Sequence, residues 1–190
     1  MIIDDLKREK KFKEAIGDFV IHFSELEFGL AKLCALTECS IFTSDEKNKN
    51  LKKYMGSTFV KKVETLSTAI NENIPELQEI WNKIEPEIKE INNKRRYIIH
   101  GIINYQFQEE ITTAHIKTKK QISTENLDIE TINKLTVKIS SLNTGIYGIN
   151  GKFNTLFTKA IVDRWNNLVN DKYKIIYTVN SEILSEWKGK

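Results

Sequence analysis

Arginine and histidine are scarce in this chain, and they concentrate in one short segment. The 190 residues include four arginines and three histidines, and Arg95, Arg96 and His100 fall within the hexapeptide Arg-Arg-Tyr-Ile-Ile-His. A guanidinium presents a planar fork of donors that matches phosphate oxygens. The imidazole of histidine exchanges protons near neutral pH. These residue types can stabilise negative charge and transfer protons, so residues 95–100 are the candidate functional centre.

A helix over about 76–103 is predicted to carry this segment. Its apolar stripe reads Leu77, Trp81, Ile84, Ile88, Ile91, Arg95, Ile98, Ile102 and Tyr105. Pro86 lies inside the stripe and predicts a kink or a break. A second, polar face carries Asn92, Asn93, Arg96, His100 and Asn104.

Arg95 is the one charged residue in the apolar stripe. An unpaired buried guanidinium is very costly, so Arg95 must either be paired or face a solvated cleft. Glu27, which borders the stripe of the first predicted helix, is a candidate partner. A purely structural interpretation therefore stays open: Arg95 and Glu27 form a buried ion pair, and His100 is a helix-end residue favoured by the helix dipole.

The remaining elements are predicted from periodicity and turn residues. The first helix, over 8–37, has a stripe of Phe12, Ile16, Phe19, Phe23, Leu26, Leu30 and Leu33. Residues 38–56 are polar and predict a loop with a short helical turn. Ser57 is the expected N-cap of a second helix over 58–72, and Pro75 is expected to start the next one.

The pattern changes after Gly101. Residues 103–120 alternate in polarity and predict a β-hairpin or two short strands. A long fourth helix is expected from Ser123 or Thr124, with a stripe of Ile132, Leu135, Ile139, Leu142, Ile146, Ile149, Phe153 and Leu156. The fold class is therefore all-α: an antiparallel four- to five-helix bundle with a small β-hairpin inserted between the third and fourth long helices. We expect one domain, 1–190, with a core over about 8–158 and a C-terminal helix and tail over 159–190.

Composition limits the classes of function. A net charge of +3 is too small to indicate nucleic-acid binding by itself. No apolar run reaches the length of a bilayer span, and the N-terminus lacks a signal peptide, so we expect a cytoplasmic protein without membrane contact. Cys34 and Cys39 are a weak metal signal, because no other thiol and no His cluster accompanies them. Cys34 lies beside the apolar stripe of the first helix and is expected to be a small buried hydrophobe. No metal site and no cofactor are expected.

The order of these features resembles the HEPN superfamily. The resemblance rests on a Phe/Leu-rich first helix with a central Ser-Glu-Leu-Glu at 24–27, then a helix ending in Arg-Arg-x-x-x-His-Gly, a hairpin and a long amphipathic helix. The hallmark of the superfamily is an Arg-x4–6-His motif, which Arg95 and His100 match with four intervening residues. The residue after the arginine is commonly Asn in the superfamily, whereas this chain has Arg96.

The resemblance implies a metal-independent endoribonuclease of a toxin–antitoxin or phage-defence system, with RNA as the substrate. His100 would be the general acid or base and Arg95 would stabilise the phosphate. Supporting or substrate-binding roles would fall to Arg96, Tyr97, Asn93, Glu27 and Asn104. The resemblance also implies a homodimer, and an antitoxin partner of nucleotidyltransferase type. The alternatives are a non-catalytic HEPN-like module that binds a nucleotide or a protein, or a structural helical protein with the Arg95–Glu27 pair.

Overall fold

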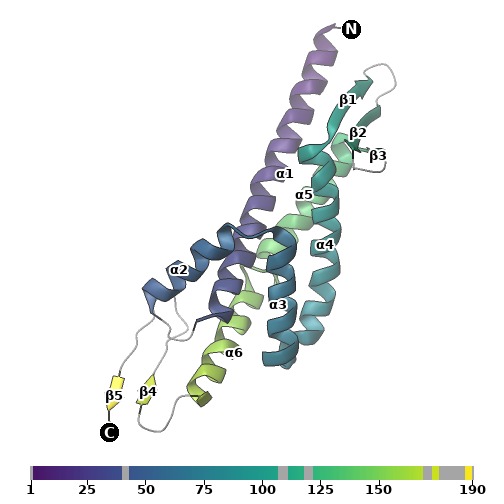
Figure 1. Cartoon of the computed structure of the whole chain (residues 1–190). Helices are drawn as coiled ribbons and strands as arrows, with labels where there is room; N and C mark the ends of the chain where they lie inside the picture. The colour runs from purple at the N-terminus through teal and green to yellow at the C-terminus, as the bar shows by residue number, and fades with distance from the viewer. Residues whose placement is uncertain are drawn as a thin grey trace.

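In the computed structural model of the protein, the long helix α1 (Ile2–Thr37) contacts most of the other helices. The structure describes residues 2–39, 43–106, 111–117, 122–168, 173–175 and 187–189. Helices α2, α3, α5 and α6 all pack against α1, and α4 packs against α3 and α5. A small antiparallel sheet lies beside the N-terminal half of α1 (Figure 1). The chain is thus mostly helical with a small sheet, as the sequence predicts.

The apolar stripe predicted for α1 forms the centre of the core. Phe12, Phe19, Phe23, Leu26, Leu30 and Leu33 are all buried, whereas Ile16 is half-buried. Burying a Phe or Leu side chain contributes about 1.5–3 kcal/mol relative to leaving it exposed. The 3-and-4 spacing of these residues therefore determines which face of α1 the other helices cover.

Residues 38–56, predicted as a loop, contain the helix α2 (Ser44–Met55), so that prediction is wrong. Among its described residues only Tyr54 is buried, so helix α2 has no apolar stripe from which it could be predicted. The helix is stabilised at its ends instead. The Thr43 hydroxyl accepts a hydrogen bond from the Glu46 N–H at 3.2 Å, and Lys52 and Lys53 lie in the last turn, where cations suit the helix dipole.

The next helices lie close to their predicted positions. Helix α3 (Phe59–Asn73) is capped by Thr58 and not by Ser57, because the Thr58 hydroxyl accepts from the Lys61 N–H. Pro75 begins the single 3-10 turn η1 (Pro75–Leu77), and α4 (Gln78–His100) follows at once. Helix α4 continues through Pro86, so of the kink or break predicted there the break is absent.

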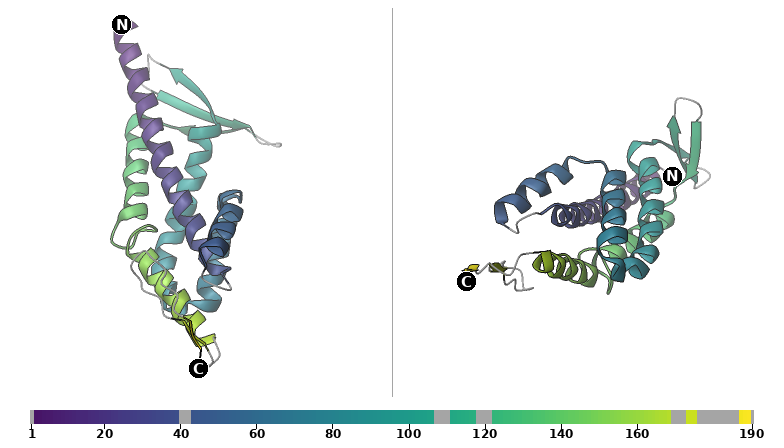
Figure 2. Two further views of the ribbon diagram at one scale, coloured as in Figure 1. Left: turned by 90° about the vertical axis from the view of Figure 1, so that its left-hand side faces the viewer. Right: turned by 60° about the horizontal axis from the view of Figure 1, so that its bottom comes forward.

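The segment after α4 forms three strands, one more than predicted: β1 (Ile102–Gln106), β2 (Ile111–Lys117) and β3 (Ile122–Asn126). They pair antiparallel in the order β1-β2-β3, with Ile102 opposite His115 and His115 opposite Thr124. Figure 2 shows the sheet projecting from the end of the helical body where α4 finishes. Residues 107–110 and 118–121 of the predicted hairpin region lie outside the described part of the chain.

The long fourth helix is in fact two helices, α5 (Ile129–Thr144) and α6 (Lys152–Leu168). Ser123 and Thr124, its expected start, lie on β3, and Asp128 is the true N-cap of α5 through a 2.6 Å hydrogen bond from the Thr131 N–H. The glycines at 145, 148 and 151 form the turn between the two helices. Ile146, expected in the core, is exposed there, while Ile149 and Phe153 are buried as predicted.

This turn packs directly against α1. Asn143 is buried and donates to the Glu25 carboxylate at 3.1 Å, and the Asn150 amide donates to the Glu25 carbonyl at 3.4 Å. Gly29 faces the turn, where a Cβ would lie 2.8 Å from the Asn150 amide and 2.9 Å from the Ile149 methyl. Strands β4 (Tyr173–Ile175) and β5 (Trp187–Gly189) pair near the C-terminus. No described helix is long and apolar enough to span a bilayer.

We predict opposite effects of alanine at two glycines of α1. Gly29→Ala should lower the free energy of unfolding by about 1–3 kcal/mol, because the new methyl overlaps buried atoms of the turn. Gly17→Ala should raise it by about 0.5–1 kcal/mol, because nothing lies within 4 Å of that position and alanine is the better helix former. Urea denaturation of both variants checks this, and equal effects at the two sites would show that the turn does not pack on Gly29.

Candidate functional site

Arg95 has its guanidinium on the ring of Phe23. The central guanidinium carbon lies 4.8 Å from the ring centroid, which is a cation–π contact between α4 and α1. The side chain is half-buried, and its Nε atom is buried without a hydrogen-bond partner. No carboxylate pairs with Arg95 in the part of the chain that the structure describes. The guanidinium is therefore positioned by an aromatic ring, and no described carboxylate neutralises its charge.

Glu27, the predicted partner of Arg95, is bound to a different cation. Its carboxylate accepts from the Lys62 ammonium at 2.7 Å, and the same ammonium donates to the Ser57 carbonyl at 2.9 Å. The Lys62 side chain is 2% exposed and that of Glu27 is 31% exposed, so the pair is buried mainly on the lysine side. The predicted Arg95–Glu27 pair is therefore wrong, and the physical reason is that Lys62 is the more deeply buried charge.

Arg96 and His100 lie on the outer face of α4. Both are exposed, and they are four residues apart, which places them on one face of the helix. Tyr97 is half-buried and packs against the core, which fits a packing role. Five residues along a helix correspond to a rotation of about 140°, so Arg95 and His100 point to different sides of α4. Within one chain the structure brings Arg96 and His100 together, but not Arg95 and His100.

The end of α4 is fixed against the sheet. The Gly101 N–H donates to the Tyr97 carbonyl at 3.0 Å, and a Cβ at Gly101 would lie 3.1 Å from the Cβ of buried Ala114 on β2. A single residue, Gly101, thus separates His100 from β1. Asn104 lies on β1 opposite Thr113, and its side chain lies outside the described residues.

Asn93 lines a groove of about 270 Å³ between α3 and α4. The α3 wall of the groove consists of Phe59, Val60 and Val63, followed by Glu64. On the α4 side, Lys89 and Asn92 lie beside Asn93. The groove therefore lies on the same polar face of α4 as Arg96 and His100, one to two turns before them.

Three contributors to this region were not predicted. Lys62 follows Phe59 by three residues and precedes Leu66 by four, so its spacing alone would place it on the buried face of α3. Phe23 was predicted as core, but its contact with Arg95 depends on how α4 lies on α1, which periodicity does not give. The groove residue Glu64 has no sequence signal that distinguishes it from other surface polar residues, whereas Asn92 was placed on the polar face of Arg96 and His100 by its spacing.

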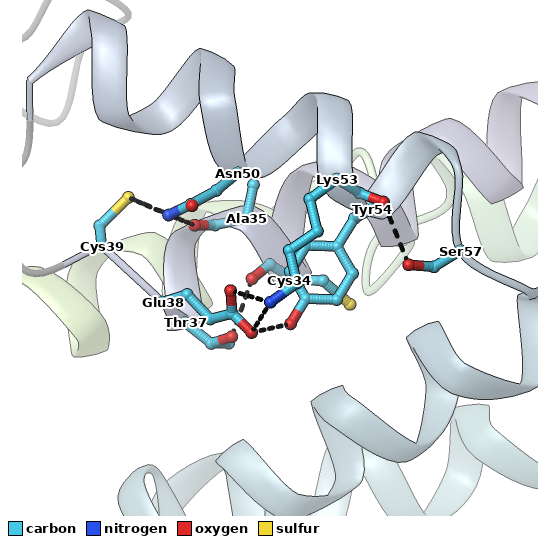
Figure 3. A network of polar contacts seen from close by, with 9 residues as sticks. All are labelled: Cys34, Ala35, Thr37, Glu38, Cys39, Asn50, Lys53, Tyr54 and Ser57. Carbon is cyan, nitrogen blue, oxygen red and sulfur yellow. Dashed lines mark hydrogen bonds and ion pairs between the residues drawn. The ribbon is translucent and has the colours of Figure 1, made fainter.

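The two cysteines lie in a polar network between α1 and α2 (Figure 3). The Glu38 carboxylate accepts from the Lys53 ammonium and from the Tyr54 hydroxyl, which holds α2 on the end of α1. Cys34 and Cys39 are buried, free and hydrogen-bonded to separate carbonyls. No cluster of three metal-ligating side chains occurs among the described residues. Cys34 is thus buried, as predicted, and Cys39 is buried as well.

Comparison of the chain with protein-family models, with curated proteins and with solved structures finds no match.

We predict that neutralising Glu27 destabilises the protein more than removing its lysine partner. Glu27→Gln leaves the buried Lys62 ammonium without a counter-charge and should cost about 3 kcal/mol. Lys62→Met should cost less, because the carboxylate left behind reaches water. The double variant Lys62→Met/Glu27→Leu should recover much of the loss. Urea denaturation measures all three, with the exposed neighbour Lys61→Met as control; a Glu27→Gln variant as stable as wild type would contradict the assignment.

We also predict that both thiols are inert in the folded protein. Burial raises the pKa of Cys34 to about 12 and also raises that of Cys39, so the reactive thiolate is scarce at pH 8. Titration with a thiol-reactive disulfide should label neither cysteine in the native protein. Both cysteines should be labelled in about 6 M guanidinium, which lies above the unfolding midpoint of most domains, about 1–5 M. Rapid labelling of Cys34 under native conditions would contradict its burial against α3.

Proposed function

We propose that this chain is a metal-independent endoribonuclease of the HEPN type, acting on RNA. The observation that carries the proposal is the guanidinium of Arg95, which is half-buried, fixed on Phe23 and unpaired with any described carboxylate. A cation in this position is a ready partner for an anion, because partial burial strengthens its electrostatic interactions. Phosphate is the anion that a guanidinium fork binds best.

The reaction suits the residues of the hexapeptide. RNA supplies its own nucleophile, the 2′-hydroxyl. The 2′-oxygen attacks the adjacent phosphorus, the bond from phosphorus to the 5′-oxygen breaks, and a 2′,3′-cyclic phosphate and a 5′-hydroxyl end are formed. The imidazole of His100 either accepts the 2′-hydroxyl proton or donates a proton to the leaving 5′-oxygen. Arg95 stabilises the negative charge on the phosphoryl oxygens in the transition state.

A second copy of the chain would complete the site. Arg95 and His100 lie on different sides of α4, whereas Arg96 and His100 share its exposed face. In a homodimer the two α4 ends would face each other, so that His100 of one protomer acts on a phosphate held by the partner's arginines. Arg96, at the position where the superfamily commonly has Asn, would hold that phosphate together with Arg95.

The proposed biological setting rests on the resemblance of the sequence to the HEPN superfamily. We propose a cytoplasmic protein of a toxin–antitoxin or phage-defence system, in which the helices that pack on α1 form an antiparallel bundle. Its partners would be RNA and an inhibitory antitoxin of nucleotidyltransferase type. Supporting roles fall to Tyr97, which positions the helix end from the core, and to Asn93 in the groove.

A second candidate function is a non-catalytic module that binds a nucleotide or a protein through the same surface. The observation that favours it is the separation of Arg95 and His100 within one chain. Such a module would use the exposed Arg96 and the adjacent groove for binding and would need no proton transfer by His100.

We predict that Arg95→Ala and His100→Ala each reduce RNA cleavage by about 100-fold or more, since each removes a group that acts on the reacting phosphate. Arg95→Lys should recover only part of the rate, because an ammonium lacks the fork of donors. The measurement is cleavage of a fluorescent RNA by the purified full chain in the presence of EDTA. The products should carry 2′,3′-cyclic phosphate ends.

His22→Ala is the matched control. His22 lies on α1 and contacts Glu25 at 3.3 Å, away from the hexapeptide, so its removal should leave the rate unchanged. If the wild-type chain binds RNA but never cleaves it, the binding module replaces the enzyme as the function. If both hexapeptide variants fold normally and cleave RNA at the wild-type rate, the roles given to Arg95 and His100 are wrong.

A further inference from the structure

The groove between α3 and α4 lies beside the proposed site and has the features of a base-binding pocket. We propose that it holds one nucleobase of the RNA, next to the phosphate bound by Arg95 and Arg96. The identification of RNA as the ligand rests on the proposed function, whereas the lining of the groove does not depend on it. Its volume of about 270 Å³ is just below the range of roughly 300–1,000 Å³ found for drug-sized ligands, which suits a single flat ring system.

One wall of the groove is apolar and suits the face of a base. It is formed by Phe59, Val60 and Val63 in the first two turns of α3. Phe59 and Val63 are buried and fixed, and Val60 is 53% exposed at the rim. Aromatic and aliphatic walls of this kind accept the flat face of a base whatever its sequence.

The opposite rim, formed by α4, is polar. Asn92 and Asn93 have no protein hydrogen-bond partner within the described ranges, whereas Lys89 is paired with Glu85 at 2.9 Å. An Asn side chain offers two donors and one acceptor, the combination that pairs with the edges of nucleobases. Single-stranded RNA is recognised in this way, by stacking on one face and hydrogen bonds to the base edge.

The groove is also aligned with the hexapeptide. Asn92, Arg96 and His100 follow one another at intervals of four residues, so they lie in a row along α4 about 6 Å apart. A nucleotide whose base enters the groove would therefore have its backbone beside Arg96. The apolar wall of the groove is also connected to Arg95 through the core. The Phe59 ring stacks on the Phe23 ring with 5.0 Å between their centroids, and the Arg95 guanidinium lies over the same Phe23 ring.

Four variants of the full chain test the groove. Val60→Trp fills it and Asn92→Ala removes its half-buried amide. Their matched controls are Val137→Trp and Asn133→Ala on α5, at exposed positions away from the groove. The probes are fluorescent 2′-O-methyl hexanucleotides of A, C, G and U, which lack the nucleophile and cannot be cleaved. Both groove variants should bind the best hexanucleotide roughly tenfold more weakly, as expected for losing one base contact, while the controls bind as wild type.

A second measurement reports on the groove without any phosphate. In the ¹⁵N-labelled wild-type chain, adenosine or uridine should shift the side-chain amide signals of Asn92 and Asn93, and Val60→Trp should abolish the shifts. Thermal unfolding followed by circular dichroism confirms that each variant is folded.

The outcomes separate this inference from the proposed function. If both groove variants bind every hexanucleotide as tightly as wild type, and nucleosides leave the Asn signals unmoved, the base site is wrong even where Arg95 and His100 prove essential for cleavage. If nucleosides bind in the groove but the chain never cleaves RNA, the base site stands and the nuclease assignment fails. Binding that Val137→Trp weakens as much as Val60→Trp would also overturn the groove as the site.

Discussion

The buried ammonium of Lys62 is the constraint on which the rest of the site depends. A charge that is almost fully removed from water must keep its partners, and Lys62 has two, the Glu27 carboxylate and the Ser57 carbonyl. The backbone carbonyl of the same lysine accepts from the Cys34 thiol at 3.2 Å. The start of α3 is thereby fixed on α1. In this position Phe59 stacks on Phe23, and Glu27 is paired with Lys62. No carboxylate among the described residues is left for Arg95, whose guanidinium lies over the Phe23 ring.

The middle of α1 joins two sides of the molecule through the short segment 24–27. Leu26 is fully buried in the core between two glutamates. Glu27 binds Lys62 of α3, and Glu25 accepts from Asn143 at the end of α5 and contacts His22. Two acidic side chains in one turn of α1 thus bind two different helices, α3 and α5. The α5–α6 turn packs against the same part of α1, where Gly29 permits close approach. An apparently ordinary Ser-Glu-Leu-Glu sequence therefore sets both the position of α3 and the course of the chain after α5.

The sequence was sufficient for some elements and insufficient for others, for physical reasons. The stripes of α1, α3 and α4 could be predicted, because they bury apolar side chains at helical spacing. Helix α2 could not, because it buries only Tyr54 and depends on capping and on Glu38. The separation of α5 from α6 could not be predicted, because Ile149 and Phe153 keep the spacing of a continuous helix. The candidate site divides in the same way: the hexapeptide follows from residue types, whereas the partner of Glu27 and the α3–α4 groove depend on how helices pack.

The single-residue connection at Gly101 has a thermodynamic consequence for His100. Because Gly101 fits against Ala114, the last turn of α4 and the paired strands β1 and β2 share one boundary. Parts of a fold can open locally with free energies below that of global unfolding. Each opening would release the C-terminal end of α4 and with it the imidazole. The fraction of molecules with His100 in its ordered position therefore depends on the local stability of the sheet, a quantity that a ligand bound to the strands would raise without touching the histidine.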